Sequence, residues 1–250
     1  MACIMWTKST FQKTGYSLLS YGIILGIWQV MTFYFSPLVV PSISSVVECL
    51  VEIITNSRLY EMIFVTTQRL IFGLSLGIIL GLVIGLLMGG NLFFRKILYP
   101  IINMFQTVPP VSWVVLALVW FGFNGKPVIF IVITTTVPIM AINISEGINM
   151  IDQSLMKMAK IYQFSRIKTF KHITMPSIIP HFKTGLQLAL GSGWKIAVMG
   201  EVLTTSNGIG GMIKTARVNI EPEYVVAWSI VTVCLFHLSN LVLGIKLPRK

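Results

Sequence analysis

The chain has 250 residues, of which 55% are hydrophobic and only 11% are charged, and its formal net charge is +11. Soluble domains carry about 25% charged residues, and here the few charges are bunched between long neutral stretches, which excludes an ordinary soluble domain. No basic stretch lies away from the positions that flank these neutral stretches, which excludes nucleic-acid binding. We therefore predict an all-α polytopic membrane protein.

About six transmembrane helices are expected, because six apolar stretches can each hold the roughly 20 residues that cross a bilayer. The first follows Lys8 and Lys13 but is too long for a signal peptide and has no cleavage site, so we expect a retained helix. The expected spans are, approximately, 16–36, 67–90, 97–122, 127–147, 182–203 and 224–245.

Basic residues gather on one side of these spans. If the N-terminus is cytoplasmic, 13 of the 19 basic residues fall on the cytoplasmic side, including the cluster from Lys157 to Lys183 and the C-terminal Lys246, Arg249 and Lys250. Acidic residues show the opposite trend, with Glu48, Glu52, Glu61, Glu221 and Glu223 outside. This bias predicts a multi-pass membrane protein with both termini cytoplasmic.

Residues 41–61 are too charged to span and are expected to lie along the outer surface. Their opening, "PSISSVVECLVEI", places Ser42 where it can cap a short helix after Pro41.

A second segment, roughly 150–180, separates the fourth and fifth spans. Asp152 or Ser154 can start a helix there, and Pro176 and Pro180 are expected to limit it at the far end. A helical i, i+3, i+4, i+7 pattern of apolar residues is formed by Leu155, Met158, Ala159 and Tyr162. The helix could rest on anionic lipid headgroups or dock in a groove of a soluble partner.

The spacing in this segment resembles the cytoplasmic signature of ABC importer permeases, Glu-Ala-Ala-x3-Gly-x9-Ile-x-Leu-Pro. Ala159, Ile173 and Pro176 match it without gaps. The positions that depart from it are Lys157, Met158, Gln163 and Met175.

Other stretches resemble permeases of the nitrate/sulfonate/taurine importer family, in order and over about residues 40–245. They are "LVVPSISSVVECL", the Gly-rich "TTQRLIFGLSLGIILGLVIGLLMG", the Pro-rich "QTVPPVSWVVLALVWFGFNGKPVIFIV", the stretch from "FSRIKTF" to "WKIAVMGE", and "NGIGGMI". The chain is accordingly identified as a member of this family.

The resemblance implies a type I ABC importer permease fold, with residues 61–246 as the transmembrane domain and residues 1–60 as an N-terminal tail, first helix and outer segment. It implies a second permease subunit, expected as a homodimer, two ATPase subunits, and a periplasmic or lipid-anchored solute-binding protein. Related permeases serve nitrate, sulfonates and other small solutes, so we expect the transported solute to be small and anionic or organic. The spans are expected to contact membrane lipid.

The same resemblance implies that the coupling helix of the permease contacts the ATPase. The expected contact residues are Leu155, Lys157, Met158, Ala159, Tyr162, Gln163, Phe164, Ser165, Arg166 and Phe170. Lys157 replaces an acidic position and predicts an acidic or neutral partner surface. Gln163 replaces a glycine, so the bend there is expected to use ordinary backbone angles.

Candidate pathway residues come from the polar and Pro-containing parts of the spans. They are Pro109, Pro110, Trp113, Trp194, Lys195 and Glu201. Lys195 could attract an anion, or it and Glu201 could each bond to a neighbouring helix, or Glu201 could lie at the interface. Arg69 could also favour anions, although snorkelling explains it more simply. Pro109 and Pro110 are expected to kink the third span.

Glycines recur at four-residue intervals on the second span, at Gly73, Gly77, Gly81 and Gly85. They predict close helix packing, either within the bundle or across a dimer.

No nucleophile–base pair, phosphate-binding Gly-Lys loop or metal-ligand spacing occurs in the chain. We therefore expect a non-catalytic subunit without cofactor or metal, with ATP and Mg bound by the ATPase partner. A secondary carrier or channel is the alternative, although we find no internal repeat.

Overall fold

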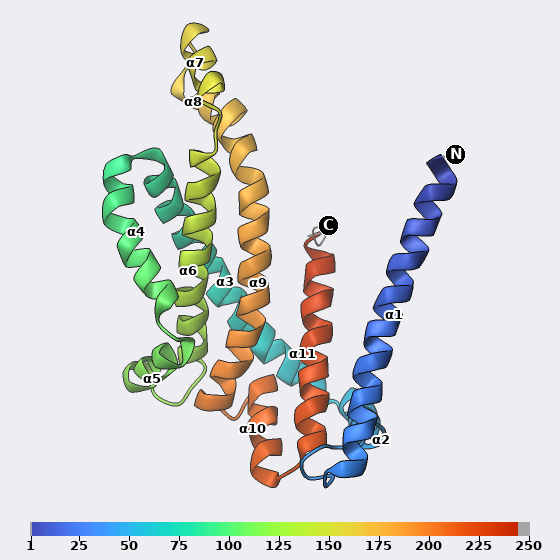
Figure 1. The fold of residues 1–250 in the computed structure, drawn as a ribbon. Helices are drawn as coiled ribbons and strands as arrows, with labels where there is room; N and C mark the ends of the chain where they lie inside the picture. Colours follow the sequence, from blue (N-terminus) through green and yellow to red (C-terminus); the bar gives the residue numbers. More distant parts are fainter. Residues whose placement is uncertain (1, 245–250) are drawn as a thin grey trace.

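Helices account for all the regular structure in the computed structural model, which describes residues 2–244 and, before residue 19, the side chain of Tyr16 alone. Lys246, Arg249 and Lys250, and the end of the expected last span, lie outside these residues. The helices are α1 (Ala2–Tyr34), α2 (Ile43–Thr55), α3 (Arg58–Gly90), α4 (Leu92–Thr107), α5 (Pro110–Phe121), α6 (Lys126–Asn149), α7 (Gln153–Ile161), α8 (Arg166–Thr169), the π-helix η1 (Phe170–Thr174), α9 (Met175–Thr204), α10 (Ile209–Asn219) and α11 (Pro222–Val242) (Figure 1).

Three helices of the described chain are long and apolar enough to cross a membrane: α3, α6 and α11. A fourth candidate is the bent pair α4 and α5. The apolar part of α1 that is described, Leu19–Tyr34, is shorter, and α9 carries Lys183, Lys195 and Glu201 within its 30 residues. All the expected spans except the third therefore correspond to one helix each, and three of them meet the criterion of length and composition.

The third expected span, 97–122, is not one kinked helix. It is broken at Val108 and Pro109, and α4 and α5 meet there at 92°. Pro109 lies between the helices and Pro110 takes the first position of α5, where a missing N–H costs nothing. Two consecutive prolines therefore end one helix and start another, which is a larger change of direction than the predicted kink.

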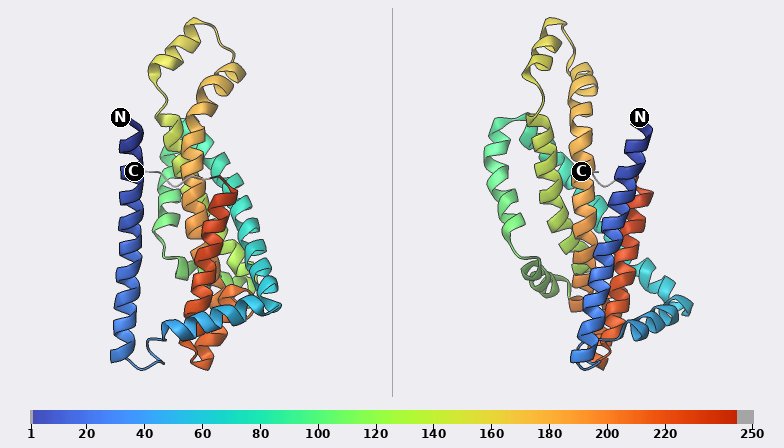
Figure 2. Two further views of the ribbon diagram at one scale, coloured as in Figure 1. Left: turned by 90° about the vertical axis from the view of Figure 1, so that its right-hand side faces the viewer. Right: turned by 45° about the vertical axis from the view of Figure 1, so that its right-hand side comes forward.

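The two ends of the helical bundle differ. α2 and α10 lie at one end, called here the α2 end, and α7 and α8 project from the opposite end, the α7 end (Figure 1). α2 lies across the bundle (Figure 2), and Ser42 caps it as predicted, accepting a hydrogen bond from the Ser45 N–H at 3.1 Å. The Tyr224 hydroxyl donates to the Glu52 carboxylate and so ties α2 to α11.

The glycines of α3 lie against α6 in a regular series. A Cβ at Gly73 would approach the Val132 Cβ to 2.7 Å, one at Gly77 the Thr136 Cβ to 2.6 Å, and one at Gly81 the Met140 Cβ to 2.5 Å. Gly85 and Gly89 continue the series opposite Ile144 and Ile148. Both helices advance four residues per step in the same direction, so they pack in parallel at the close distance that small residues permit.

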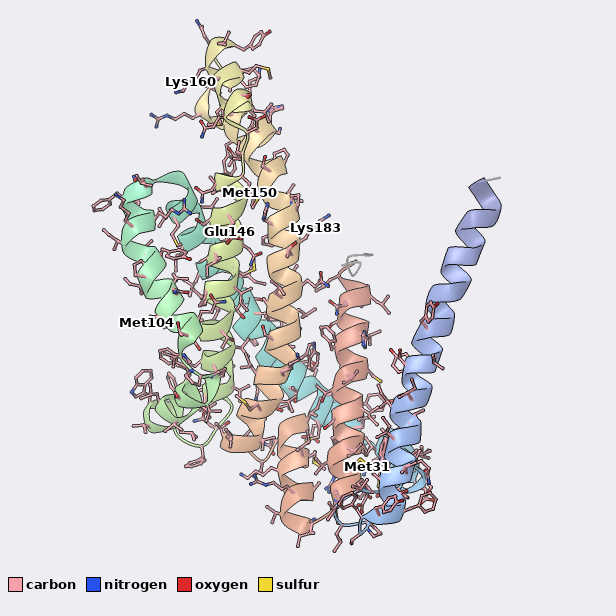
Figure 3. All side chains as sticks on the ribbon, viewed as in Figure 1. Met31, Met104, Glu146, Met150, Lys160 and Lys183 are labelled. Atoms are coloured by element: carbon pink, nitrogen blue, oxygen red, sulfur yellow. The ribbon has the colours of Figure 1, made fainter. Side chains whose placement is uncertain are left out.

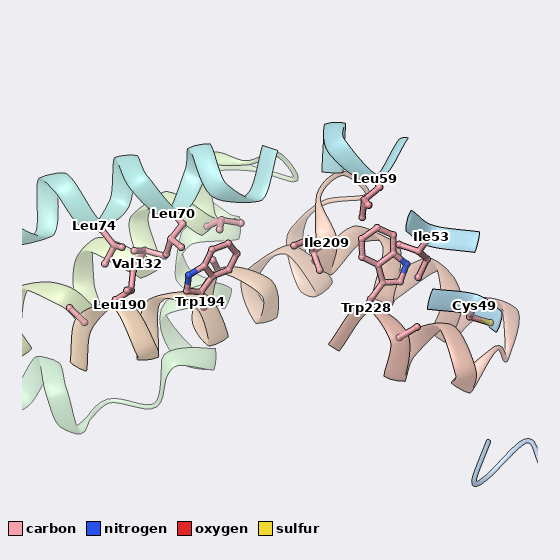
Figure 4. Packing of buried hydrophobic residues seen from close by; sticks show 14 of the residues in the cluster. Cys49, Ile53, Leu59, Leu70, Leu74, Val132, Leu190, Trp194, Ile209 and Trp228 are labelled. Atoms are coloured by element: carbon pink, nitrogen blue, oxygen red, sulfur yellow. The ribbon is translucent and has the colours of Figure 1, made fainter. Parts of the chain in front are cut away.

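The buried core continues from this interface towards the α2 end. Leu70, Leu74 and Leu190 surround the indole of Trp194, and a neighbouring group places Trp228 beside Ile53, Leu59 and Ile209 (Figure 4). The opposite face of α3 exposes large apolar side chains, among them Ile71, Phe72, Ile79 and Leu80. An extensive exposed apolar surface of this kind is typical of helices surrounded by lipid.

Candidate functional site

The segment that projects from the α7 end, residues 150–174, is called here the protruding segment. Lys160 lies at its far tip and Lys183 near the start of α9, where the bundle begins (Figure 3). Of the two predicted caps, Asp152 starts α7: its carboxylate accepts a hydrogen bond from the Ser154 N–H at 2.8 Å. That bond lowers the pKa of Asp152, so the cap is ionised at neutral pH.

The turn after α7 contradicts the prediction of ordinary backbone angles. Gln163 has a φ of +51°, in the left-handed region that favours glycine. The Phe164 N–H donates to the Ala159 carbonyl at 2.9 Å, and Ala159 is buried. The carbonyls at the end of α7 are satisfied only if the chain reverses sharply at 163, so the backbone takes the glycine-like conformation although the side chain is glutamine.

Gln163→Gly is expected to stabilise this turn by about 1 kcal/mol, because it removes the cost of placing a Cβ in the left-handed region. The matched control, Lys160→Gly, lies inside α7 and should destabilise the segment by about 1 kcal/mol. Amide hydrogen exchange of residues 150–174 measures both. The same sign for the two substitutions would contradict the turn described here.

The second half of the protruding segment joins the bundle without a break. Ser165 caps α8, accepting a hydrogen bond from the Lys168 N–H at 3.3 Å, and η1 leads directly into α9. Pro176 and Pro180 do not limit the segment as predicted, because Pro176 lies in the first turn of α9 and Pro180 inside it. Thr174 and Met175 keep helical backbone angles, so the helix continues from η1 through Pro176 without a break.

Apolar side chains of the protruding segment are exposed. Met158 is 45% exposed, Tyr162 69% and Ile167 81%, while Leu155 and Phe170 are exposed to a similar degree as Met158. Cationic side chains surround them, at Lys157, Lys160, Arg166, Lys168 and Lys171, and the Lys168 ammonium lies 4.5 Å from the centre of the Phe164 ring. An apolar patch with a charged rim on a segment that projects from the bundle is typical of a surface that contacts a protein or a membrane.

A second polar cluster lies inside the bundle towards the α2 end. Glu201 on α9 is fully buried and forms an ion pair with Arg69 on α3, at 2.7 Å between Oε1 and Nη1. Its Oε2 accepts hydrogen bonds from the Thr66 hydroxyl at 2.8 Å and from the Gly210 N–H at 3.0 Å. The expectation that Glu201 bonds to a neighbouring helix is confirmed.

The explanation of Arg69 by snorkelling is also wrong. Its guanidinium is held by Glu201 and by the Asn207 carbonyl, at 3.1 Å, and packs on Gly125. It also borders an open groove of about 410 Å³ between α3 and the loop before α6, with Lys126 on the other side. Sequence reasoning missed Thr66 and this pairing. The available signal was the cost of a buried carboxylate, which requires donors from neighbouring helices.

The other candidate pathway residues are distributed over the bundle. Trp194 is buried in the core and donates to the Ser239 hydroxyl at 3.2 Å, so it does not line an open pathway here. Lys195, the next residue, is exposed and forms no ion pair with any described residue. Trp113 follows the break at Pro109 and Pro110, and its ring stacks on Phe105 with 5.1 Å between centroids.

Among the described residues, no group of histidine, cysteine or acidic side chains could hold a metal ion. In the same part of the chain, the ion pair of Arg69 with Glu201 is the only salt bridge.

Comparison with known proteins supplies the family. Residues 73–249 match the family described as binding-protein-dependent transport system inner membrane component. The putative aliphatic sulfonates transport permease protein SsuC of Escherichia coli is 30% identical over 87% of this chain and 83% of its own length. The taurine transport system permease protein TauC of the same organism is 24% identical over 90% of this chain and 84% of its own. The nitrate import permease protein NrtB of Leptolyngbya laminosa is 29% identical over 64% of this chain and 57% of its own.

Solved structures show the same fold. An inward-facing structure of the methionine ABC transporter MetNI matches with a TM-score of 0.61 and 15% identity, over 76% of this chain and 96% of the matched chain. A bacterial ABC transporter involved in import of the acidic polysaccharide alginate matches with a TM-score of 0.58 and 17% identity, over 93% of this chain and 97% of the matched chain. The architecture is therefore that of type I ABC importer permeases.

Proposed function

Because the chain belongs to the family of binding-protein-dependent transport inner membrane components, which are multi-pass permease subunits of ABC importers, we propose that it forms the pathway for a small anionic or organic solute. A solute-binding protein delivers this solute at the α2 end. The relatives named for sulfonate, taurine and nitrate support this class of solute. The α2 end then faces outward and both termini are cytoplasmic.

The exposed apolar patch of the protruding segment carries the proposal. Met158, Tyr162 and Ile167 are exposed on a segment that projects from the bundle, and a soluble partner must cover them. We assign this partner as the ATPase subunit, in two copies for two copies of the permease. The partner binds ATP and Mg, and this chain hydrolyses nothing itself. The cationic rim requires an acidic or neutral surface on the ATPase.

Co-purification from membranes tests this function. A tagged chain is expected to retain an ATPase subunit and to show no ATP hydrolysis after that subunit is stripped away. ATP-dependent uptake by the reconstituted complex, strictly dependent on a solute-binding protein, is the second expected result. Solute transport by the isolated chain without any ATPase would support a secondary carrier or channel and overturn the proposal.

Lys195 is the residue we place in the pathway. It lies within the expected span 182–203, where an exposed lysine is costly in lipid and tolerable in a water-filled passage, and it has no acidic partner among the described residues. Its ammonium would there attract an anion.

Lys195→Met is therefore expected to lower the rate of anion uptake about tenfold, equivalent to about 1.4 kcal/mol. Lys195→Arg should retain most of the uptake, and Lys183→Met, near the start of the same helix, provides the matched control. Uptake measured at equal expression separates the outcomes. Full anion transport by Lys195→Met would remove the residue from the pathway.

A further inference from the structure

The buried carboxylate of Glu201 is connected through α9 to the protruding segment. It lies in the last turn of α9, and α9 is continuous with η1 and α8 of the protruding segment. One helix of 30 residues thus runs from the protruding segment to the α2 end of the bundle. A displacement of the protruding segment must move Glu201 if α9 stays intact.

Glu201 joins this helix end to two other elements. Through Thr66 and Arg69 it bonds to α3, and through the Gly210 N–H it bonds to the first turn of α10. The Thr66 hydroxyl in turn accepts from the Ile209 N–H at 2.9 Å. Carboxylates are favourable at a helix N-terminus, where free N–H groups carry partial positive charge. The end of α9, α3 and the start of α10 are therefore held by one side chain.

The Gly208-Ile209-Gly210 sequence is shaped around that side chain. Gly208 has a φ of +90°, and a Cβ there would lie 2.4 Å from Glu201 Oε1. A Cβ at Gly210 would lie 2.3 Å from the Val198 carbonyl oxygen and 2.5 Å from the Glu201 Cβ. The Gly-x-Gly element thus lets the backbone of the loop approach the carboxylate, and its place is fixed by Glu201.

We propose that Glu201 is a positioning residue for transport. It passes the movement of α9 to α10 and to Arg69, which borders the groove between α3 and the loop before α6. This rests on the proposed function, because it requires that an ATPase moves the protruding segment. Arg69 borders this groove together with Lys126. A shift of Glu201 therefore changes the position of the Arg69 guanidinium in the groove. Without Glu201, ATP hydrolysis continues but no longer controls the position of Arg69 at the groove.

The experiment compares ATP consumed per solute imported in proteoliposomes that contain the complete transporter and its solute-binding protein. Glu201→Gln is expected to raise this ratio at least about tenfold, and the milder Thr66→Val, which removes one donor to the carboxylate, should raise it about threefold. The exposed Glu61→Gln on α3 should leave it unchanged. The double variant Arg69→Met with Glu201→Leu replaces the ion pair by apolar side chains, which usually preserves folding, and should remain uncoupled.

The outcomes are distinguishable. A double variant that folds and keeps the wild-type ratio, or a Thr66→Val variant with an unchanged ratio, would show that the cluster only stabilises the fold. If the wild-type transporter itself imports solute without ATP, the proposed function fails, whatever the variants do.

Discussion

Gly81→Val is expected to destabilise the protein by about 3 kcal/mol, because overpacking a close interface forces backbone shifts. A Cβ at this position would lie 2.5 Å from the Met140 Cβ and 2.9 Å from the Val137 carbonyl oxygen. Backbone cannot move aside as a flexible side chain can. The midpoint of thermal unfolding in detergent measures the loss.

Gly90 offers the matched control, since a Cβ there would meet nothing within 4 Å. Gly90→Val at the end of the same helix should change the midpoint little. An equal loss at both positions would mean that helix propensity, and not contact with α6, decides the effect.

Tyr162→Asp is expected to weaken binding of the ATPase subunit at least about 30-fold, equivalent to about 2 kcal/mol, as for a buried aromatic anchor. The side chain is exposed in this chain alone and would be desolvated in the complex. The amount of ATPase retained on the purified permease, and its dissociation rate, measure the change. The fold of the bundle should be unaffected, since Tyr162 packs outside it.

Gln153→Asp is the matched control for this prediction. It introduces the same charge in the first turn of α7, on a side chain that is also exposed. Retention of the ATPase by Gln153→Asp and its loss from Tyr162→Asp is the expected pair of results. Normal retention by both variants would place the ATPase contact elsewhere.

The helices could be predicted from the sequence wherever apolar length or a cap is a local property. The cap at Ser42, the start of α7 at Asp152 and the glycine repeat of α3 all follow from residues near one another in the chain. The 92° break after α4 was underestimated, because two prolines indicate an interruption but not the direction in which the chain leaves it.

The polar cluster around Glu201 shows why other features of the site could not be predicted from the sequence. Glu201 and Arg69 are 132 positions apart, so nothing local reveals that they meet. The backbone at Gln163 illustrates the opposite limit: local preference favoured ordinary angles, and the hydrogen bonds that close α7 prevailed over it. Tertiary contacts decided the pairing of Glu201 with Arg69, and the local hydrogen bonds at the end of α7 decided the backbone at Gln163.

The four-residue repeat shared by α3 and α6 has a mechanical consequence. Four residues of helix correspond to about 6 Å, so α3 could slide along α6 only in jumps of that size, since any smaller shift drives a side chain such as Thr136 or Ile144 out of its glycine notch. The packing of the two helices therefore opposes small sliding movements of one along the other. During a transport cycle α3 and α6 should therefore move together as one rigid unit.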